Sequence, residues 1–379
     1  MILNENSTPK VLAVASGKGG VGKTLFASNL ALRLAANGHS TIAVDMDLGG
    51  SNLHSYLGIK NTNVGIGNLL SDGRLKFADL IIETPYEHLG FVPGDVLVSG
   101  VSNLQLAQRK SIATAIAKVP AEYVIVDLGS GTGSRVVDFF LISNSGLIVT
   151  VPQAPAVLNA YSLLKSMTFR LLQQTFAENK KITTYLNRIL KEKRPGAGIS
   201  IHEIVTEIAA KETRSGKKAR EVLSALQPKI IINMSRDSED LRIIESLHEL
   251  VAKNLEINLE CLGLISFDAR VSEAVASLGP FTEAHPESVV TRQIERIAQK
   301  ILQSEKYPYM PLDLESYHDT YELARIEAEG DFEDIQQETQ EVSNQAGIET
   351  AELIEMISEQ KKQIRELRGA LRMLTMKQQ

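Results

Sequence analysis

The hydrophobic positions of the first 165 residues alternate between short apolar runs and longer stretches with helical spacing. Residues 24–36 carry apolar side chains at the spacing of an amphipathic helix. The apolar runs, rich in Val, Ile, Leu and Ala, cover residues 11–15, 41–44, 89–92, 123–126 and 146–151. Strands separated by helices predict a doubly wound, mostly parallel α/β sheet with right-handed crossovers.

The same alternation returns after a helical interruption. Strand-like runs at 229–233 and 262–265 precede a stretch of helical spacing over about 288–304. The residues between the two halves have helical spacing and are broken by a Pro-Gly pair. The pattern therefore predicts one α/β domain with a helical insert, formed by residues 9–165 and 229–306 for the domain and 166–228 for the insert.

The C-terminal quarter has a different character. Residues 307–345 are acidic, rich in Gln and poor in β-branched side chains, so we expect an acidic linker that is partly helical or disordered. Residues 346–379 predict an amphipathic helix with a coiled-coil-like seam. The apolar side chains of that seam recur at alternating spacings of three and four, at Leu353, Ile357, Ile364, Leu367, Leu371 and Leu374.

Composition and charge narrow the class of protein. The chain has 379 residues, a net charge of −6 and a single cysteine, Cys261, which excludes an internal disulfide and a CxxC metal or redox motif. No apolar run approaches the length of a membrane span, and the polar residues 1–9 do not form a secretory signal, so a cytoplasmic location is expected. Residues 179–229 are basic, whereas 313–359 hold Arg325 as their one basic residue.

A phosphate-binding pattern follows the first predicted strand. Residues 17–24 read Gly-Lys-Gly-Gly-Val-Gly-Lys-Thr, which matches the P-loop. In such a loop Lys23 reaches the β- and γ-phosphates, and the Thr24 hydroxyl ligates magnesium. The helix that begins here adds its positive end. ATP and Mg²⁺ are therefore the predicted ligands, with phosphate-binding backbone at Gly17, Gly19, Gly20, Val21, Gly22, Lys23 and Thr24.

Acidic residues stand at the ends of two predicted strands. Asp45 and Asp47 follow the run at 41–44, and Asp127 ends the run at 123–126, as in a Walker B strand. The carboxyl ends of parallel strands meet at the ligand-binding edge of an open sheet, so Asp127 is predicted to hold Mg²⁺ through water. An aspartate in these places is also a common helix N-cap or turn residue, and that alternative stays open.

Lys18 is a second lysine inside the loop that a P-loop does not need for its own phosphates. It is either a solvated charge or a contact made elsewhere. Ser16–Thr24 resembles the deviant Walker A box of the MinD/ParA ATPases. The resemblance implies that Lys18 crosses the interface of an ATP-sandwich dimer and stabilises the phosphoryl group transferred in the partner's site.

The same resemblance assigns roles to other residues. It implies that Asp47 orients the attacking water, that Asp45 lies near the metal shell and that Gly129 follows the γ-phosphate. Asn233, at the end of a later strand, corresponds to a residue that often reads adenine in this family, although an Asn there could equally form a turn. The predicted catalytic residues are thus Lys18, Lys23 and Asp47, and the predicted metal-binding residues are Thr24, Asp45 and Asp127.

Three segments narrow the resemblance within the family. Residues 151–165, 232–235 and 263–268 are similar to flagellar-number regulators of the FlhG type, also called FleN or YlxH. This implies a homodimeric ATPase, slow and stimulated by a protein effector, that acts in spatial regulation of flagella or of the division site. Residues 1–9 lack the Gln-Ala-x-x-Leu-Arg character common at the start of FlhG-type proteins, so stimulation of a partner GTPase by that route is not expected.

Two alternatives remain at the sequence level. The basic insert is also suited to a ParA-like partitioning ATPase that binds DNA nonspecifically, although a solvated helical face explains the charge as well. The C-terminal helix suits a coiled coil or partner docking, and its Lys and Arg residues also suit a membrane surface. The second choice would place the protein peripherally at the inner face of the membrane or at a cell pole.

Overall fold

The computed structural model describes residues 9–48, 50–60, 64–71, 74–94, 104–143, 145–191, 200–303 and 320–345. The chain divides into two units, Met1–Ala328 and Glu329–Gln379. The first residues of the chain, 1–8, and the predicted C-terminal helix, 346–379, lie outside the described residues.

An eight-stranded sheet forms the centre of the first unit, in the order β3-β4-β2-β5-β1-β6-β7-β8. All neighbouring strands are parallel except β3 and β4, which are antiparallel. The prediction of a doubly wound, mostly parallel sheet is confirmed. The strands are β1 (Lys10–Ser16), β2 (Thr41–Met46), β3 (Ile82–Glu83), β4 (Leu89–Val92), β5 (Tyr123–Ser130), β6 (Leu147–Thr150), β7 (Lys229–Ser235) and β8 (Glu260–Ser266).

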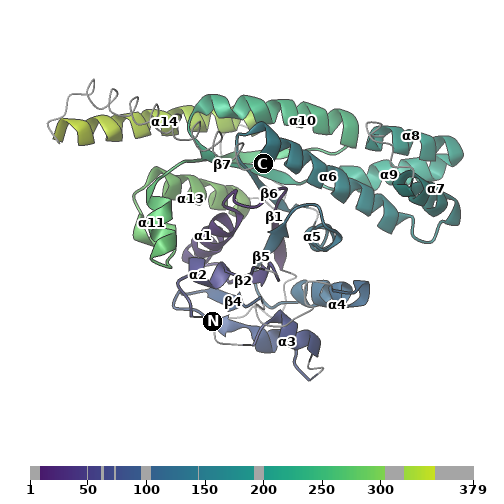
Figure 1. The fold of residues 1–379 in the computed structure, drawn as a ribbon, viewed down its shortest axis with the longest axis horizontal. Coiled ribbons are helices and arrows are strands. Elements are labelled where there is room, and N and C mark those ends of the chain that lie inside the picture. The colour runs from purple at the N-terminus through teal and green to yellow at the C-terminus, as the bar shows by residue number, and fades with distance from the viewer. Residues whose placement is uncertain are drawn as a thin grey trace, which may run out of the picture. The chain divides into compact units, whose positions relative to one another are not determined.

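Helices cover both faces of the sheet because its central strands are apolar on both sides (Figure 1). One face carries α1 (Lys23–Ala36) and α13 (Val289–Leu302), with α2 (Leu53–Tyr56), α11 (Arg270–Ala276) and α12 (Phe281–Ala284) nearby. The other carries α4 (Leu106–Ile116), α5 (Ser134–Phe140) and α6 (Ala154–Thr175). The short α3 (Ile66–Ser71) follows the loop after α2.

The helical insert is built on the long helix α6. This helix runs through residue 165, where the sequence pattern places the domain boundary, so core and insert share it. The insert adds α7 (Lys180–Lys191), α8 (Ile201–Lys211) and α9 (Thr213–Ser224), and α6 and α8 pack against α10 (Arg242–Leu255). Ser200 begins α8 with a capping box, since its hydroxyl accepts from Glu203 N at 3.1 Å and the Glu203 carboxylate accepts from Ser200 N at 2.7 Å.

The segment predicted as an acidic linker contains α14 (Thr320–Gln345). The first turns of α14, up to Ala328, belong to the first unit and pack beside the edge strand β8. Thr320 Oγ1 accepts from Cys261 N at 3.1 Å, and Tyr321 Oη donates to Leu259 O at 2.8 Å. Side chains of α14 therefore hydrogen-bond backbone groups at the start of the edge strand β8 and just before it.

No helix within the described ranges combines the length and the apolar character needed to cross a membrane.

Candidate nucleotide site

The P-loop lies between β1 and α1, at the edge of the sheet where the strand order reverses around β1. Two different constraints require glycine in this loop. Gly20 and Gly22 have φ values of 81° and 82°, which side chains rarely adopt. Gly17 instead touches α6 so closely that a Cβ atom there would lie 2.3 Å from the carbonyl oxygen of Asn159. The loop is therefore shaped by its own turn and by a neighbouring helix.

The two charged residues predicted to contact phosphate and metal form an ion pair with each other. Lys23 Nζ lies 2.6 Å from Asp127 Oδ1, and both side chains are buried. Burial raises the pKa of Asp127 to about 6, although the Lys23 charge opposes the change. Without nucleotide, the Asp127 carboxylate is paired with the Lys23 ammonium group, which is the group that a phosphate would bind.

The residues at this pair fit a magnesium ion. Asp127 Oδ2 is buried and has no hydrogen-bond partner within the described part of the chain. The Thr24 hydroxyl lies 3.4 Å from Lys23 Nζ, at the start of α1. One carboxylate, one hydroxyl and nucleotide phosphates form the oxygen ligand set that Mg²⁺ prefers, with water completing its shell.

Asp45 makes the local contacts expected of a turn residue. It is buried, and its carboxylate accepts from Ser51 Oγ at 2.7 Å, Leu53 N at 3.0 Å and Asp47 N at 3.1 Å. Burial raises the pKa of Asp45, while these hydrogen bonds oppose the rise. Asp45 also stands opposite Asp127 in the register of β2 and β5. Its contact with the metal shell remains a prediction, whereas its role in fixing the loop after β2 is visible.

The end of β5 lies beside both the loop after β2 and the P-loop. A Cβ atom on Gly129 would lie 3.2 Å from Asp47 Oδ1, and one on Gly19 would lie 3.6 Å from Ser130 Oγ. Asp47 is half-buried, and Lys18 is exposed. Asp47 thus lies beside the end of β5 that adjoins the P-loop, and the Lys18 side chain faces solvent.

Asn233 contacts the P-loop in a way that the sequence did not indicate. Its buried Nδ2 donates to Val21 O at 2.9 Å. A Cβ atom on Gly22 would lie 2.2 Å from the same Nδ2, so the small loop residue and the amide are matched in shape. The contact joins residues 212 positions apart, and no local pattern encodes it. The predicted contact of Asn233 with adenine remains a prediction.

The residues described above lie within a segment that matches a known protein family. Residues 12–281 match the model of the CobQ/CobB/MinD/ParA nucleotide binding domain. The chain belongs to this family. The match spans the P-loop, Asp47, Gly129 and Asn233, which confirms the resemblance to MinD/ParA ATPases.

Two members of known role are similar to this chain. The flagellum site-determining protein YlxH of Helicobacter pylori is 28% identical over 247 residues, covering 62% of this chain and 81% of the relative. The antiactivator FleN of Pseudomonas aeruginosa is 23% identical and covers 77% of this chain and 86% of the relative. The resemblance to the FlhG type is thereby confirmed.

Solved structures show the same fold. The cell division ATPase MinD of Pyrococcus furiosus has a TM-score of 0.53 and 19% identity, covering 78% of this chain and 98% of that one. This chain therefore carries the family's nucleotide-binding fold.

Proposed function

We propose that this protein is an ATP-hydrolysing switch that pairs two ATP-bound copies and controls the number or placement of a cellular structure. Flagella are the first candidate, because YlxH and FleN are similar over most of their lengths, and the division site is the second. The observation that carries the proposal is the exposed Lys18 in a P-loop whose other lysine, Lys23, is already committed to the local site.

The mechanism assigns one task to each residue of the site. Lys23 leaves Asp127 and binds the β- and γ-phosphates, while Thr24 and, through water, Asp127 would hold Mg²⁺. Bound Mg²⁺ would neutralise charge on the phosphate oxygens. Asp47 orients the water that attacks the γ-phosphate, and Lys18 of the second copy stabilises the transferring group. Hydrolysis is slow until a protein effector binds. Once ATP is hydrolysed, the two copies dissociate.

The proposal is tested by localising the fluorescently tagged protein in cells, with Lys18→Ala beside the wild type. We expect wild-type protein to gather at a pole or at the membrane and the variant to be diffuse. A diffuse signal from both would contradict the positioning role. Purified Asp47→Ala should bind ATP but turn it over at least about a hundredfold more slowly, as expected for loss of a water-orienting group.

A ParA-like role is the second candidate, and exposed basic residues of the insert favour it. Lys180, Lys217 and Lys218 are exposed on α7 and α9. DNA affinity that falls steeply with salt would support this role. So would loss of that affinity on neutralising the basic residues of the insert, namely Lys211, Arg214, Lys217, Lys218 and Arg220.

The predicted C-terminal helix, 346–379, is the proposed route of the protein to a membrane or a partner. ATP-dependent binding to anionic liposomes that is lost on deleting residues 360–379 would support peripheral membrane attachment. Retention of liposome binding after the deletion would contradict it, and loss of a pull-down partner without any liposome binding would favour coiled-coil docking.

A further inference from the structure

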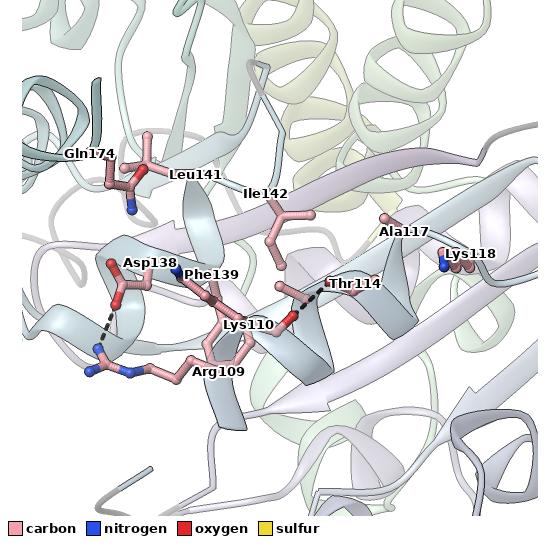
Figure 2. Close-up of a pocket in the computed structure, with 11 residues that line it drawn as sticks. Arg109, Lys110, Thr114, Ala117, Lys118, Asp138, Phe139, Leu141, Ile142 and Gln174 are labelled. Carbon is pink, nitrogen blue, oxygen red and sulfur yellow. Dashed lines mark hydrogen bonds and ion pairs between the residues drawn. The ribbon is translucent and has the colours of Figure 1, made fainter. Parts of the chain in front are cut away.

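A groove of about 570 Å³ lies between α4, α5 and α6 (Figure 2). Its lining combines apolar and basic side chains. Figure 2 shows Arg109 and Asp138 toward one end and Lys118 toward the other. The phosphate-site residues take no part in it, so the proposed ATP chemistry leaves the groove unexplained.

The spacing of the lining residues suits a helix. Arg109, Ala113 and Ala117 follow one another at a spacing of four along α4 and the turn after it, and the small side chains of Ala113 and Ala117 leave room for close approach. Leu141 and Ile142, both half-buried, line the groove beyond the end of α5. An amphipathic helix binds such a groove through apolar side chains spaced three and four apart.

The charge of the groove selects an acidic occupant. Its one lining carboxylate, Asp138, is already bound by Arg109 Nη1 at 2.5 Å and by Arg170 Nε at 2.6 Å. Lys110 and Lys118 are exposed on the same rim. Arg109 Nε is buried without a hydrogen-bond partner among the described residues. The positive charge therefore exceeds what the chain itself neutralises here.

We propose that this groove docks an amphipathic helix with acidic flanks, supplied by a partner protein. Its apolar side chains lie along Ala113 and Ala117, and its carboxylates meet Lys110 and Lys118. Charge complementarity of this kind speeds encounter and fixes orientation.

The docked helix also contacts an element that leads back to the nucleotide site. Helix α5 carries Asp138 and begins at Ser134, a few residues after the end of β5, where Gly129 lies beside Asp47. A partner carboxylate that competes with Asp138 for Arg109 weakens the contact between α4 and α5, and so alters the connection from α5 back to Gly129. This coupling rests on the proposed function, whereas the docking does not.

The docking is tested with the full chain and a phage-displayed library of helix-forming random peptides of about 15 residues, or four turns. We expect selected peptides to carry Glu or Asp beside an apolar face. Their dissociation constants should rise by about tenfold or more in Lys110→Glu and Lys118→Glu, as expected when a favourable charge contact becomes a repulsion. Ala117→Phe, which fills the groove without changing charge, should have the same effect.

Lys253→Glu, which reverses an exposed lysine on α10, is the matched control and should bind as the wild type does. Circular dichroism and MgATP affinity confirm that each variant is folded. A selection that yields no peptide family, or peptides that bind the variants equally well, overturns the proposal. If Lys110→Glu and Lys118→Glu still bind the peptides but bind anionic vesicles less well than the wild type does, the two lysines contact lipid instead, and the proposal is overturned.

A second measurement separates this inference from the proposed function. Added peptide should change the ATP hydrolysis rate of the wild type and leave that of Lys118→Glu unchanged. Peptide bound in the groove without any change in rate overturns the coupling. Wild-type protein that hydrolyses no ATP at all contradicts the proposed function, while the peptide dissociation constants still decide the docking.

Discussion

At the scale of single residues, the most informative contact is the buried pair between Lys23 and Asp127. Each residue of the pair has a separate predicted role once nucleotide is bound, one toward phosphate and one toward magnesium. Without nucleotide they neutralise each other at 2.6 Å. Binding must exchange this contact for phosphate and metal contacts, so the pair opposes binding of nucleotide alone.

Asp127→Asn should therefore have opposite effects with and without magnesium. In EDTA we expect the variant to bind ATP more tightly, by about tenfold or more, because a charge-assisted contact of about 1.5–3 kcal/mol no longer competes for Lys23. Adding Mg²⁺ should strongly increase the ATP affinity of the wild type and should change the ATP affinity of the variant only slightly. Titration calorimetry measures both, and Asp79→Asn, an exposed residue, serves as control. Equal affinities of wild type and Asp127→Asn in EDTA would show that the pair does not compete with phosphate.

The raised pKa of Asp127 predicts how the stability of the nucleotide-free protein changes with pH. A folded-state pKa of about 6 exceeds the ordinary value of 3.8, so between these values the folded state binds more protons than the unfolded state. The contribution of Asp127 to the free energy of unfolding is therefore greatest at acidic pH and is lost as pH rises through about 6. Asp127→Asn cannot titrate. Urea unfolding between pH 5 and 8 should show the wild type losing stability relative to the variant as pH rises; a constant difference would contradict the assignment.

At the scale of elements, the P-loop depends on α6 as well as on β1 and α1. Gly17→Ala would place a methyl group 2.3 Å from backbone atoms of Asn159 in α6, which a side-chain rotation cannot relieve. We expect a loss of stability of about 1–3 kcal/mol or more, typical of overpacking. Gly19→Ala is the matched control, because its nearest contact would be an ordinary 3.6 Å to Ser130 Oγ. In thermal unfolding without nucleotide, Gly17→Ala should have the lower midpoint temperature. Equal midpoints would show that α6 shifts to accommodate the methyl group at little cost.

The elements that the sequence predicted well are those with a strong local signal. Continuous apolar runs gave the parallel strands, since both faces of those strands are buried. The glycine-rich loop indicated the nucleotide-binding family that the comparison then showed. Strand β3 (Ile82–Glu83) was missed because two residues carry no periodic pattern.

Contacts between distant elements could not be read from local patterns. The bonds from Asn233 to Val21 and from Arg109 to Asp138 join separate elements. A signal did exist for the anchored start of α14. Its buried residues, Tyr321, Ala324 and Ala328, recur at spacings of three and four, which is the stripe of a core-facing helix. The acidic composition around them concealed that stripe.

At the scale of the whole molecule, the two lysines of the loop have different surroundings. Lys23 is buried and paired with Asp127 of β5, whereas Lys18 is exposed. In the proposed mechanism the site of Lys23, Thr24, Asp47 and Asp127 becomes complete only when a second copy supplies Lys18. The proposed dimer therefore follows from the division of labour between the two lysines of the loop.

This division can be tested by mixing two inactive variants. Lys18→Ala retains Asp47 but cannot serve its partner, and Asp47→Ala retains Lys18 but cannot orient water in its own site. In a mixed dimer, the site on the Lys18→Ala chain has its own Asp47 and receives Lys18 from the other chain, so it is complete. Random pairing gives half mixed dimers with one working site each, so about a quarter of wild-type ATP turnover should return, as for a residue supplied in trans. If Lys18 acts within its own chain, each variant carries its defect into every dimer, and the mixture hydrolyses ATP no faster than the average of the two variants alone.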